Sequence, residues 1–471
     1  MFLQKRKFVT ASLSLFTTLC VLSWRWSELD KRLPAATLDY FHSDEVHESP
    51  YSTAIREFLQ RPVLSYEESV KLNSASCPTD GVNFDVDSVT QYEEKWRNIS
   101  SSHVSRWRSE IATYMEEKRL KSGLSEGENG KIGRGIVMAA GDRHAAIRAR
   151  TNIRLLRSYN CTLAVEIFHF EGELSDADQA LLEEILSPEV TDGLDESNKV
   201  TLRIVEGVHK GDDWKAFQIK GAAIQQSSFN EILYLDTDSY LLRNPETLFE
   251  SRYWEETGLL LWLDYTKSHA TNPVWRLLGQ QCRNEYEGES GQIAISRSRH
   301  QDLLWLVEYF AMNHREFYGF MDGDRESFRA AALLLGKKWN GPARLNAAAG
   351  IASMDVTKGG GHTMLQAGLD GKWMFVHANL IKHGHFRRPL WKRITRAAYD
   401  RFEGGTYGNI DPPNDMLGKG VKLRVDPKPR METTMEPFEG YDKALVVVED
   451  WDSYEELRGF EDRWFELGGV H

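Results

Sequence analysis

Short apolar runs alternate with segments of helical periodicity in the middle of this chain. Parallel strands need long crossover connections, which are usually helices, so the alternation predicts a parallel sheet with right-handed crossovers. The expected strands are 135–140, 163–170, 200–205, 232–235, 258–263, 291–295, 373–377 and 444–448. The expected helices are 144–158, 175–186, 213–226 and 300–312. The sequence therefore predicts an α/β fold with a mostly parallel central sheet flanked by helices.

Two aspartates, Asp236 and Asp238, directly follow the fourth expected strand. In an extended chain, residues i and i+2 face the same side, so the two carboxylates are expected to lie together. Carboxylates so close repel each other unless a cation lies between them. Magnesium and manganese favour such oxygens and commonly share their sites with substrate phosphates. The pair also falls at the carboxyl end of a strand, where open α/β sheets bind ligands.

An ordinary turn followed by a helix cap also explains an isolated Asp-x-Asp that precedes Asn244 and Pro245. A calcium-binding EF-hand loop is excluded, because Tyr240 and Leu241 stand where that loop needs a ligand and a glycine. The place of the pair at the end of a strand in an alternating sheet favours a metal-bound diphosphate over a simple turn.

The amino-terminal segment has the features of a membrane anchor. Lys5, Arg6 and Lys7 precede an uncharged run at 8–24, and about 20 apolar residues span a bilayer. Basic flanking residues predict a cytoplasmic amino end, and a short span fits the thinner early secretory membranes. We expect a single-pass type II membrane protein of the early secretory pathway with a lumenal catalytic domain; a cleaved signal peptide is the alternative. The expected parts are a tail at 1–7, a signal anchor at 8–26, a stem at 27–130 and a catalytic domain at 131–471.

Composition narrows the compartment and the partners. The net charge of -12 argues against a nucleic-acid partner. Two N-glycosylation acceptor triplets, at Asn98 and Asn160, agree with a lumenal body. The expected stem has helical spacing over 88–120, and the glycine-containing residues 122–130 predict a linker. Three cysteines outside the expected anchor allow at most one disulfide, so the fold must depend mainly on its core. They are Cys77, Cys161 and Cys282.

Six blocks of this sequence resemble the fungal Golgi α-mannosyltransferases that build outer-chain and branch mannose on glycoproteins. The resemblance covers about 135–383, and the blocks follow the family's order. They are Lys220–Phe229, Leu235–Pro245, Thr257–Asp264, Glu289–Gln292, Gly323–Phe328 and Phe375–Lys382. The resemblance implies a GT-A-like catalytic domain at 131–471, a location in the Golgi membrane, a divalent metal (usually manganese), a nucleotide-sugar donor (usually GDP-mannose) and retention of the α configuration. Ser239 departs from the asparagine that the family often has there, which leaves the metal pair intact but affects the finer donor contacts.

Resemblance and chemistry together indicate roles for individual residues. The expected metal ligands are Asp236, Asp238 and His377; strand-ending histidines complete the metal shell in similar GT-A enzymes. The expected catalytic residues are Asp236, Asp238, Asp324 and Gln292. The expected donor-binding residues are Asp142, Arg143, Lys220, Asp264 and Lys382. Plainer roles stay open: His377 as a core histidine, Lys220 as a solvated helix lysine, and Asp324 as a helix cap.

The sequence thus predicts a membrane-anchored α-mannosyltransferase that uses Mn²⁺ or Mg²⁺ and transfers mannose from GDP-mannose to glycoprotein glycan (mannan) acceptors. A UDP-dependent galactosyl- or glucosyltransferase of the same fold is one alternative, and a non-catalytic lumenal glycan-binding protein is another. A glycosidase is disfavoured, because it needs opposed carboxylates that flank the scissile bond. The basic stretch 387–393 fits either an anionic acceptor or a solvated surface.

Overall fold

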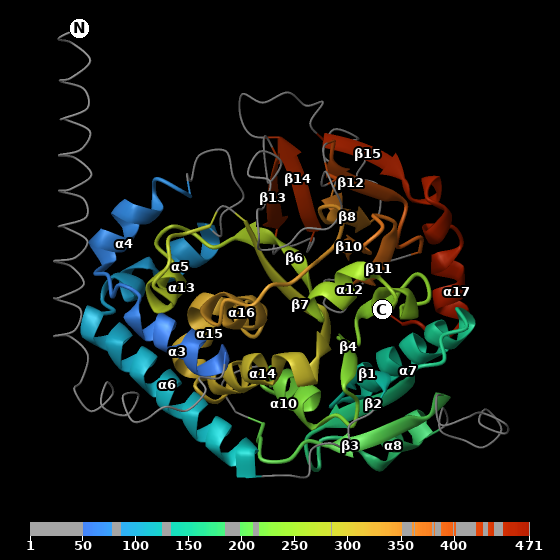
Figure 1. The fold of residues 1–471 in the computed structure, drawn as a ribbon. Helices are drawn as coiled ribbons and strands as arrows, with labels where there is room; N and C mark the ends of the chain where they lie inside the picture. The colour runs from blue at the N-terminus through green and yellow to red at the C-terminus, as the bar shows by residue number, and fades with distance from the viewer. Residues whose placement is uncertain are drawn as a thin grey trace, which may run out of the picture.

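The computed structural model describes most of the chain from residue 50 onward. The described ranges are 50–77, 86–124, 133–183, 198–210, 216–283, 285–350, 360–361, 363–378, 381, 388–398, 400–401, 421–426, 432–437 and 446–470. Within them, two six-stranded sheets lie side by side, and helices pack around the first sheet (Figure 1).

The first, central sheet has the order β3-β2-β1-β4-β7-β6. Its strands are β1 (Arg134–Ala139), β2 (Ala164–His169), β3 (Val200–Ile204), β4 (Glu231–Leu235), β6 (Leu259–Lys267) and β7 (Tyr286–Ser296). The first four strands pair in parallel, whereas β7 is antiparallel to both β4 and β6. The mostly parallel central sheet is therefore confirmed. The strand expected at 291–295 is part of a longer strand that runs against its neighbours, because apolar patterning does not encode strand direction.

Helices cover both faces of the central sheet, as the continuous apolar runs predict for parallel strands. The flanking helices are α7 (Arg143–Ser158), α8 (Asp176–Glu183), α10 (Ile219–Gln226) and α14 (Arg297–Met312). On β4, Ile232 and Tyr234 enter one core with α10 and α14, while Leu233 and Leu235 enter another with α7. Gly221 on α10 lets that helix approach α14 closely, since a Cβ there would lie 3.0 Å from Val307.

The second sheet is antiparallel throughout, with the order β15-β12-β8-β10-β11-β5. Its strands are β5 (Ser239–Leu241), β8 (Ala347–Gly350), β10 (Thr363–Ala367), β11 (Trp373–His377), β12 (Arg393–Ala397) and β15 (Val446–Asp450). Only two of these strands were expected, at 373–377 and 444–448. A smaller sheet contains β9 (Gly360–Gly361), β13 (Val421–Asp426) and β14 (Glu432–Pro437). β5 begins directly after the acidic pair, so the chain passes there from the first sheet to the second.

The amino-terminal helices pack against the body of the protein. They are α3 (Pro50–Gln60), α4 (Tyr66–Asn73), α5 (Val86–Arg97) and α6 (Ser101–Leu124). In Figure 1, α6 lies along the outside of α3 and α14. Val104, Trp107 and Ile111 of α6 are buried in one core with residues of α14, and Cys77 forms a disulfide with Cys282. The division of the chain at residue 130 stays a prediction, although the described part of the expected stem shares its core with the body.

The remaining described helices are short. Four belong to the helical layer or to the edges of the sheets: α11 (Glu246–Phe249), α12 (Arg252–Thr257), α13 (Pro273–Leu278) and α17 (Phe460–Glu466). Two others, α15 (His314–Met321) and α16 (Ser327–Leu334), flank the loop at 322–326. The expected tail at 1–7 and anchor at 8–26 lie outside the described residues, as does most of the expected linker. Across the ranges that the structure describes, no helix has the length and apolarity needed to cross a membrane.

The Cys77–Cys282 disulfide closes a span of 205 residues and ties the amino-terminal helices to the body. Removing a native disulfide typically costs about 2–5 kcal/mol. We expect the double variant Cys77→Ala/Cys282→Ala to lower the free energy of unfolding by that amount in urea titrations followed by tryptophan fluorescence. Cys161→Ala, at a buried free cysteine, is the control and should cost about 1 kcal/mol. Equal urea midpoints for the double variant and the unaltered protein would contradict this role.

Candidate functional site

The acidic pair lies in the turn between β4 and β5. β4 ends at Leu235, and the backbone NH of Asp236 donates to the carbonyl of Gly291 on β7 (2.8 Å). The backbone NH of Ser239 then donates to the carbonyl of Asp236 (3.0 Å), which closes the turn. The prediction that Asp236 and Asp238 share one face of an extended strand is therefore wrong. A turn at the carboxyl end of β4 brings the two carboxylates together. The expected location at that edge of the sheet is confirmed.

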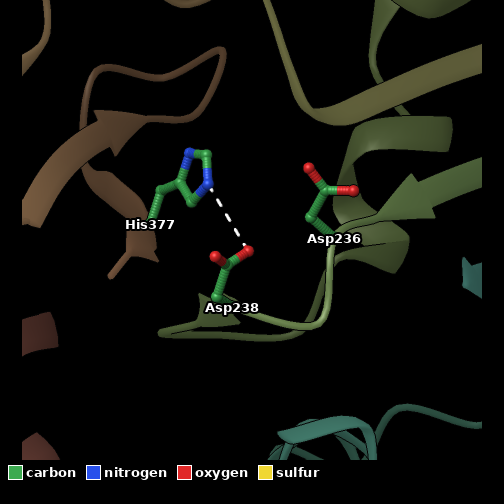
Figure 2. Close-up of side chains that lie close together, drawn as sticks. All are labelled: Asp236, Asp238 and His377. Carbon is green, nitrogen blue, oxygen red and sulfur yellow. Dashed lines mark ion pairs between the residues drawn. The ribbon is translucent and has the colours of Figure 1, made fainter. Parts of the chain in front are cut away.

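His377 joins the pair through the second sheet. It is the last residue of β11, which pairs with β5 so that His377 lies opposite Ser239. The backbone NH of Ala378 donates to the carbonyl of Asp238 (2.8 Å), and His377 Nε2 lies 3.5 Å from Asp238 Oδ1. Figure 2 shows the imidazole facing Asp238, with Asp236 to the right, at the start of the turn. One potential ligand atom from each of the three residues lies within 4.8 Å of the other two.

This cluster of Asp236, Asp238 and His377 fits a divalent cation. Ligand atoms around one octahedral Mg²⁺ lie about 3 to 4.2 Å apart, and the three side chains lie close enough to approach that spacing. Asp238 and His377 are buried, whereas the side chain of Asp236 is 29% exposed. The site is therefore held firmly by the protein and retains one open side.

The electrostatics around His377 also indicate a place for positive charge. Burial lowers the pKa of His377, but the Glu289 carboxylate and the hydrogen bond with Asp238 outweigh it and raise the pKa to about 9. Glu289 Oε1 lies 3.7 Å from His377 Nδ1 and accepts a hydrogen bond from the backbone NH of Gly291 (2.7 Å). Among the residues that the structure describes, the carboxylates thus outnumber the cationic groups around the imidazole, and a metal ion is able to take the place of its extra proton.

Lys220 lies at the centre of a second, connected group. Its ammonium donates to Ser290 O (2.7 Å), to Ser290 Oγ (2.8 Å) and to Asp236 Oδ2 (3.2 Å), and it lies 2.8 Å from Asp324 Oδ2. Burial lowers the pKa of Lys220, yet Asp236 and Asp324 raise it well above its usual value. The Tyr234 hydroxyl donates to the other oxygen of Asp236 (3.0 Å). The structure therefore brings together the predicted residues Lys220, Asp236 and Asp324.

Gln292 is fully buried next to the acidic turn. Its Oε1 accepts a hydrogen bond from Ser239 Oγ (2.9 Å), and its Nε2 donates to Gln366 Oε1 (2.7 Å). Both ends of the amide are thus used within the protein. The hydroxyl at Ser239, where the resemblance led us to expect asparagine, is part of this network.

Asp264 belongs to a separate buried network at the carboxyl end of β6. Arg325 forms ion pairs with Asp264, Glu287 and Asp322. Burial raises the pKa of Asp264 to about 6, with Arg325 opposing the shift and Glu289 adding to it. Sequence reasoning missed Arg325 as an individual residue, although it lies inside the quoted block at 323–328. No local signal marks its role, because its two buried partners, Asp264 and Glu287, come from distant strands.

The other predicted donor-binding residues have different surroundings. Asp142 caps α7, since its side chain accepts a hydrogen bond from the backbone NH of Ala145 (2.7 Å). Arg143 has a 60% exposed side chain and pairs with Asp178 at 3.4 Å. Both lie at the carboxyl end of β1, next to β4, and their role in donor binding stays a prediction. Lys382 lies outside the described residues.

Gly291 makes room for His377, because a Cβ at this position would lie 2.7 Å from the imidazole Cε1. We expect Gly291→Ala to displace His377 and to weaken Mn²⁺ binding at least about tenfold in calorimetric titrations. Gly319→Ala is the matched control, since a Cβ there meets nothing within 4 Å and alanine favours the surrounding helix. Unchanged Mn²⁺ affinity in folded Gly291→Ala protein would remove His377 from the metal site.

Comparison with known proteins agrees with this geometry. The family described as "Mannosyltransferase putative" matches residues 133–287 and 278–367. The alpha-1,2-mannosyltransferase MNN21 of Candida albicans is 27% identical over 351 residues, covering 62% of this chain and 44% of that protein. MNN2 of the same organism, also an alpha-1,2-mannosyltransferase, is 23% identical over 297 residues, covering 53% and 48%. The chain thus spans less than half the length of these curated relatives.

Among solved structures, mouse xyloside xylosyltransferase 1 superposes with a TM-score of 0.29 at 14% identity, covering 43% of this chain and 82% of that one. The predicted α/β class, with its mostly parallel sheet and the acidic pair after the fourth strand, is confirmed. The family match extends from β1 to β10 and includes Asp236 and Asp238 but not His377. The chain is a distant member of the fungal α-1,2-mannosyltransferase family.

Proposed function

We propose that this protein is a metal-dependent α-mannosyltransferase that transfers mannose from GDP-mannose to glycan acceptors on glycoproteins, with retention of configuration. The observation that carries the proposal is the convergence of Asp236, Asp238 and His377 at the carboxyl edge of the central sheet. This edge is where α/β sheets bind ligands, and the chain belongs to a mannosyltransferase family.

Asp236, Asp238 and His377 would hold Mn²⁺ or Mg²⁺. The imidazole favours Mn²⁺, because Mg²⁺ prefers an all-oxygen shell. A cation bound there supplies Lewis-acid stabilisation of the charge that develops on the leaving diphosphate. The protein contributes the fixed geometry: hydrogen bonds within the turn and the pairing of β5 with β11 orient the ligands before any substrate binds.

Gln292 and Asp324 act on the site through other residues in this proposal. Gln292 fixes Ser239, which follows Asp238 in the turn. Asp324 is buried and bound to Lys220 and to the Ser290 hydroxyl (3.3 Å). The contacts of Gln292 and Asp324 do not require either residue to act as a base. Both mechanisms of retention therefore fit the site: front-face attack, in which the leaving phosphate accepts the proton of the acceptor hydroxyl, and a covalent intermediate.

The sugar pocket is proposed to lie along β6 and β7. Asp264 and Glu289 lie on neighbouring strands there, because Trp262 of β6 pairs with Glu289 of β7. Arg325 holds Asp264 by an ion pair and fixes its carboxylate. Buried carboxylates of this kind are suited to accept hydrogen bonds from sugar hydroxyls.

A Golgi lumenal location is part of the proposal and rests on the amino-terminal sequence. Both glycosylation acceptors fit it, because Asn98 and Asn160 are exposed. Asn160 follows the carboxyl end of α7, which begins at the carboxyl edge of the sheet and runs back toward the amino edge. The Asp236, Asp238 and His377 cluster lies at the carboxyl edge, where β4 ends. A glycan at Asn160 would thus be remote from the cluster along the sheet.

Replacing one metal ligand by its amide tests the metal requirement. We expect Asp238→Asn to lower kcat/KM for mannose transfer at least about 100-fold, because the amide removes the charge that holds the cation. Asp462→Asn, at a carboxylate with an 81% exposed side chain, is the control and should keep full activity. Full activity of the unaltered protein after treatment with excess chelator would contradict the metal dependence.

A donor panel tests the sugar and the base. The purified protein is supplied with Mn²⁺, mannose oligosaccharides and either GDP-mannose, UDP-galactose or UDP-glucose, and product linkage is determined by methylation analysis. We expect mannose transfer in an α linkage from GDP-mannose, inhibited by GDP more strongly than by UDP. Transfer from a UDP-sugar alone would establish the alternative enzyme, and oligosaccharide binding without transfer from any donor would establish a non-catalytic protein.

A further inference from the structure

Lys220 is a buried cation placed directly beside the proposed metal ligands. The residue is 4% exposed, and its ammonium also faces the ring of Tyr234 at 5.1 Å. An ammonium has three N–H bonds to donate. The two oxygens of Ser290, together with the carboxylates of Asp236 and Asp324, supply four acceptors within 3.2 Å. The protein itself therefore satisfies every donor of Lys220.

This saturation argues against the predicted contact between Lys220 and a donor diphosphate. A phosphate oxygen would have to displace a buried carboxylate or a backbone carbonyl, and the displaced group would lose its partner in a place remote from water. Lys220 thus acts on the metal site through Asp236. Both oxygens of Asp236 are engaged, one by Lys220 and one by the Tyr234 hydroxyl (3.0 Å).

The charge of Lys220 opposes that of a metal ion. Four carboxylates are buried or half-buried around the cluster, and they belong to Asp236, Asp238, Glu289 and Asp324. Lys220 neutralises part of their charge. A fixed positive charge that is hydrogen-bonded to one metal ligand lowers the attraction of the site for a free dication. A diphosphate that enters together with the cation adds negative charge and offsets this loss.

We propose that Lys220 sets the cation affinity of the site, so that Mn²⁺ is held firmly only together with a nucleoside diphosphate. Lys220 is then a positioning residue that couples metal binding to donor binding. This inference rests on the proposed function, because it assumes that the Asp236, Asp238 and His377 cluster binds a metal and a diphosphate.

The test measures Mn²⁺ binding to the full-length protein by isothermal titration calorimetry, with and without saturating GDP. We expect Lys220→Met to bind Mn²⁺ alone at least about tenfold more tightly than the unaltered protein, because a repulsive unit charge has gone. The gain in Mn²⁺ affinity that GDP produces should shrink by a similar factor. Lys220→Arg keeps the charge and is the matched control, for which we expect Mn²⁺ affinity close to that of the unaltered protein.

Two outcomes overturn the inference. Equal or weaker Mn²⁺ binding by folded Lys220→Met would show that its charge does not oppose the metal. Loss of GDP binding without any gain in Mn²⁺ affinity would show that Lys220 contacts the diphosphate directly. Failure of the proposed function looks different, because neither the unaltered protein nor any variant would then bind Mn²⁺.

Lys220→Met leaves Asp324 as a buried carboxylate without its partner, which endangers folding. The pair Asp324→Asn and Lys220→Met/Asp324→Asn avoids this problem, since the double variant removes both members of the ion pair. We expect the double variant to bind Mn²⁺ at least about tenfold more tightly than Asp324→Asn alone, with thermal unfolding as the check on folding. Equal Mn²⁺ affinity of these two variants would overturn the inference in the same way.

Discussion

The pairing of β5 with β11 is the interaction on which the candidate site depends. It places His377 opposite Ser239, and the bond from Ala378 N to Asp238 O extends the pairing into the acidic turn. Side chains alternate between the two faces of a strand, so a slip of one residue would turn His377 away from Asp238. The register is fixed by packing, because Phe375 of β11 is buried in one core with Leu235 of the central sheet. The cluster of Asp236, Asp238 and His377 is thus a product of two sheets joined by a shared apolar core.

Buried charge is the second constraint, and its arrangement differs between two networks. Near the turn, the carboxylates of Asp236, Asp238, Glu289 and Asp324 surround Lys220 and His377. Farther along β6 and β7, Arg325 and Arg329 each form ion pairs with more than one carboxylate. Carboxylates outnumber cations among the described residues of both networks. The network near Asp238 differs in that potential ligand atoms of three residues lie within 4.8 Å of one another, so it is the one suited to receive a cation from outside the protein.

The sequence predicts the local features of this protein better than the long-range ones. The apolar run before Asp236 is sufficient to identify a buried strand, and its position in an alternating series places the pair at a ligand-binding edge. The direction of β7 is not predictable in this way, because antiparallel and parallel strands can share an apolar pattern. The alanines at 347–349 form a central strand of the second sheet, although alanine has low β propensity. Neighbouring strands determine such elements, and no local pattern encodes them.

The described residues of the site converge from five regions, and resemblance to a family identified those that the spacing of the acidic pair did not. The residues near each position in the sequence do not reveal that Asp142 caps a helix whereas Lys220 contacts the acidic turn. The partners of Lys220 lie 16 to 104 positions away in the chain. The placement of Lys220 depends in turn on the helical layer. α10 packs closely on α14 through Gly221, and α14 packs on α6. The amino-terminal helices, which the sequence assigns to a stem, therefore support the helix that holds Lys220 beside the proposed metal ligands.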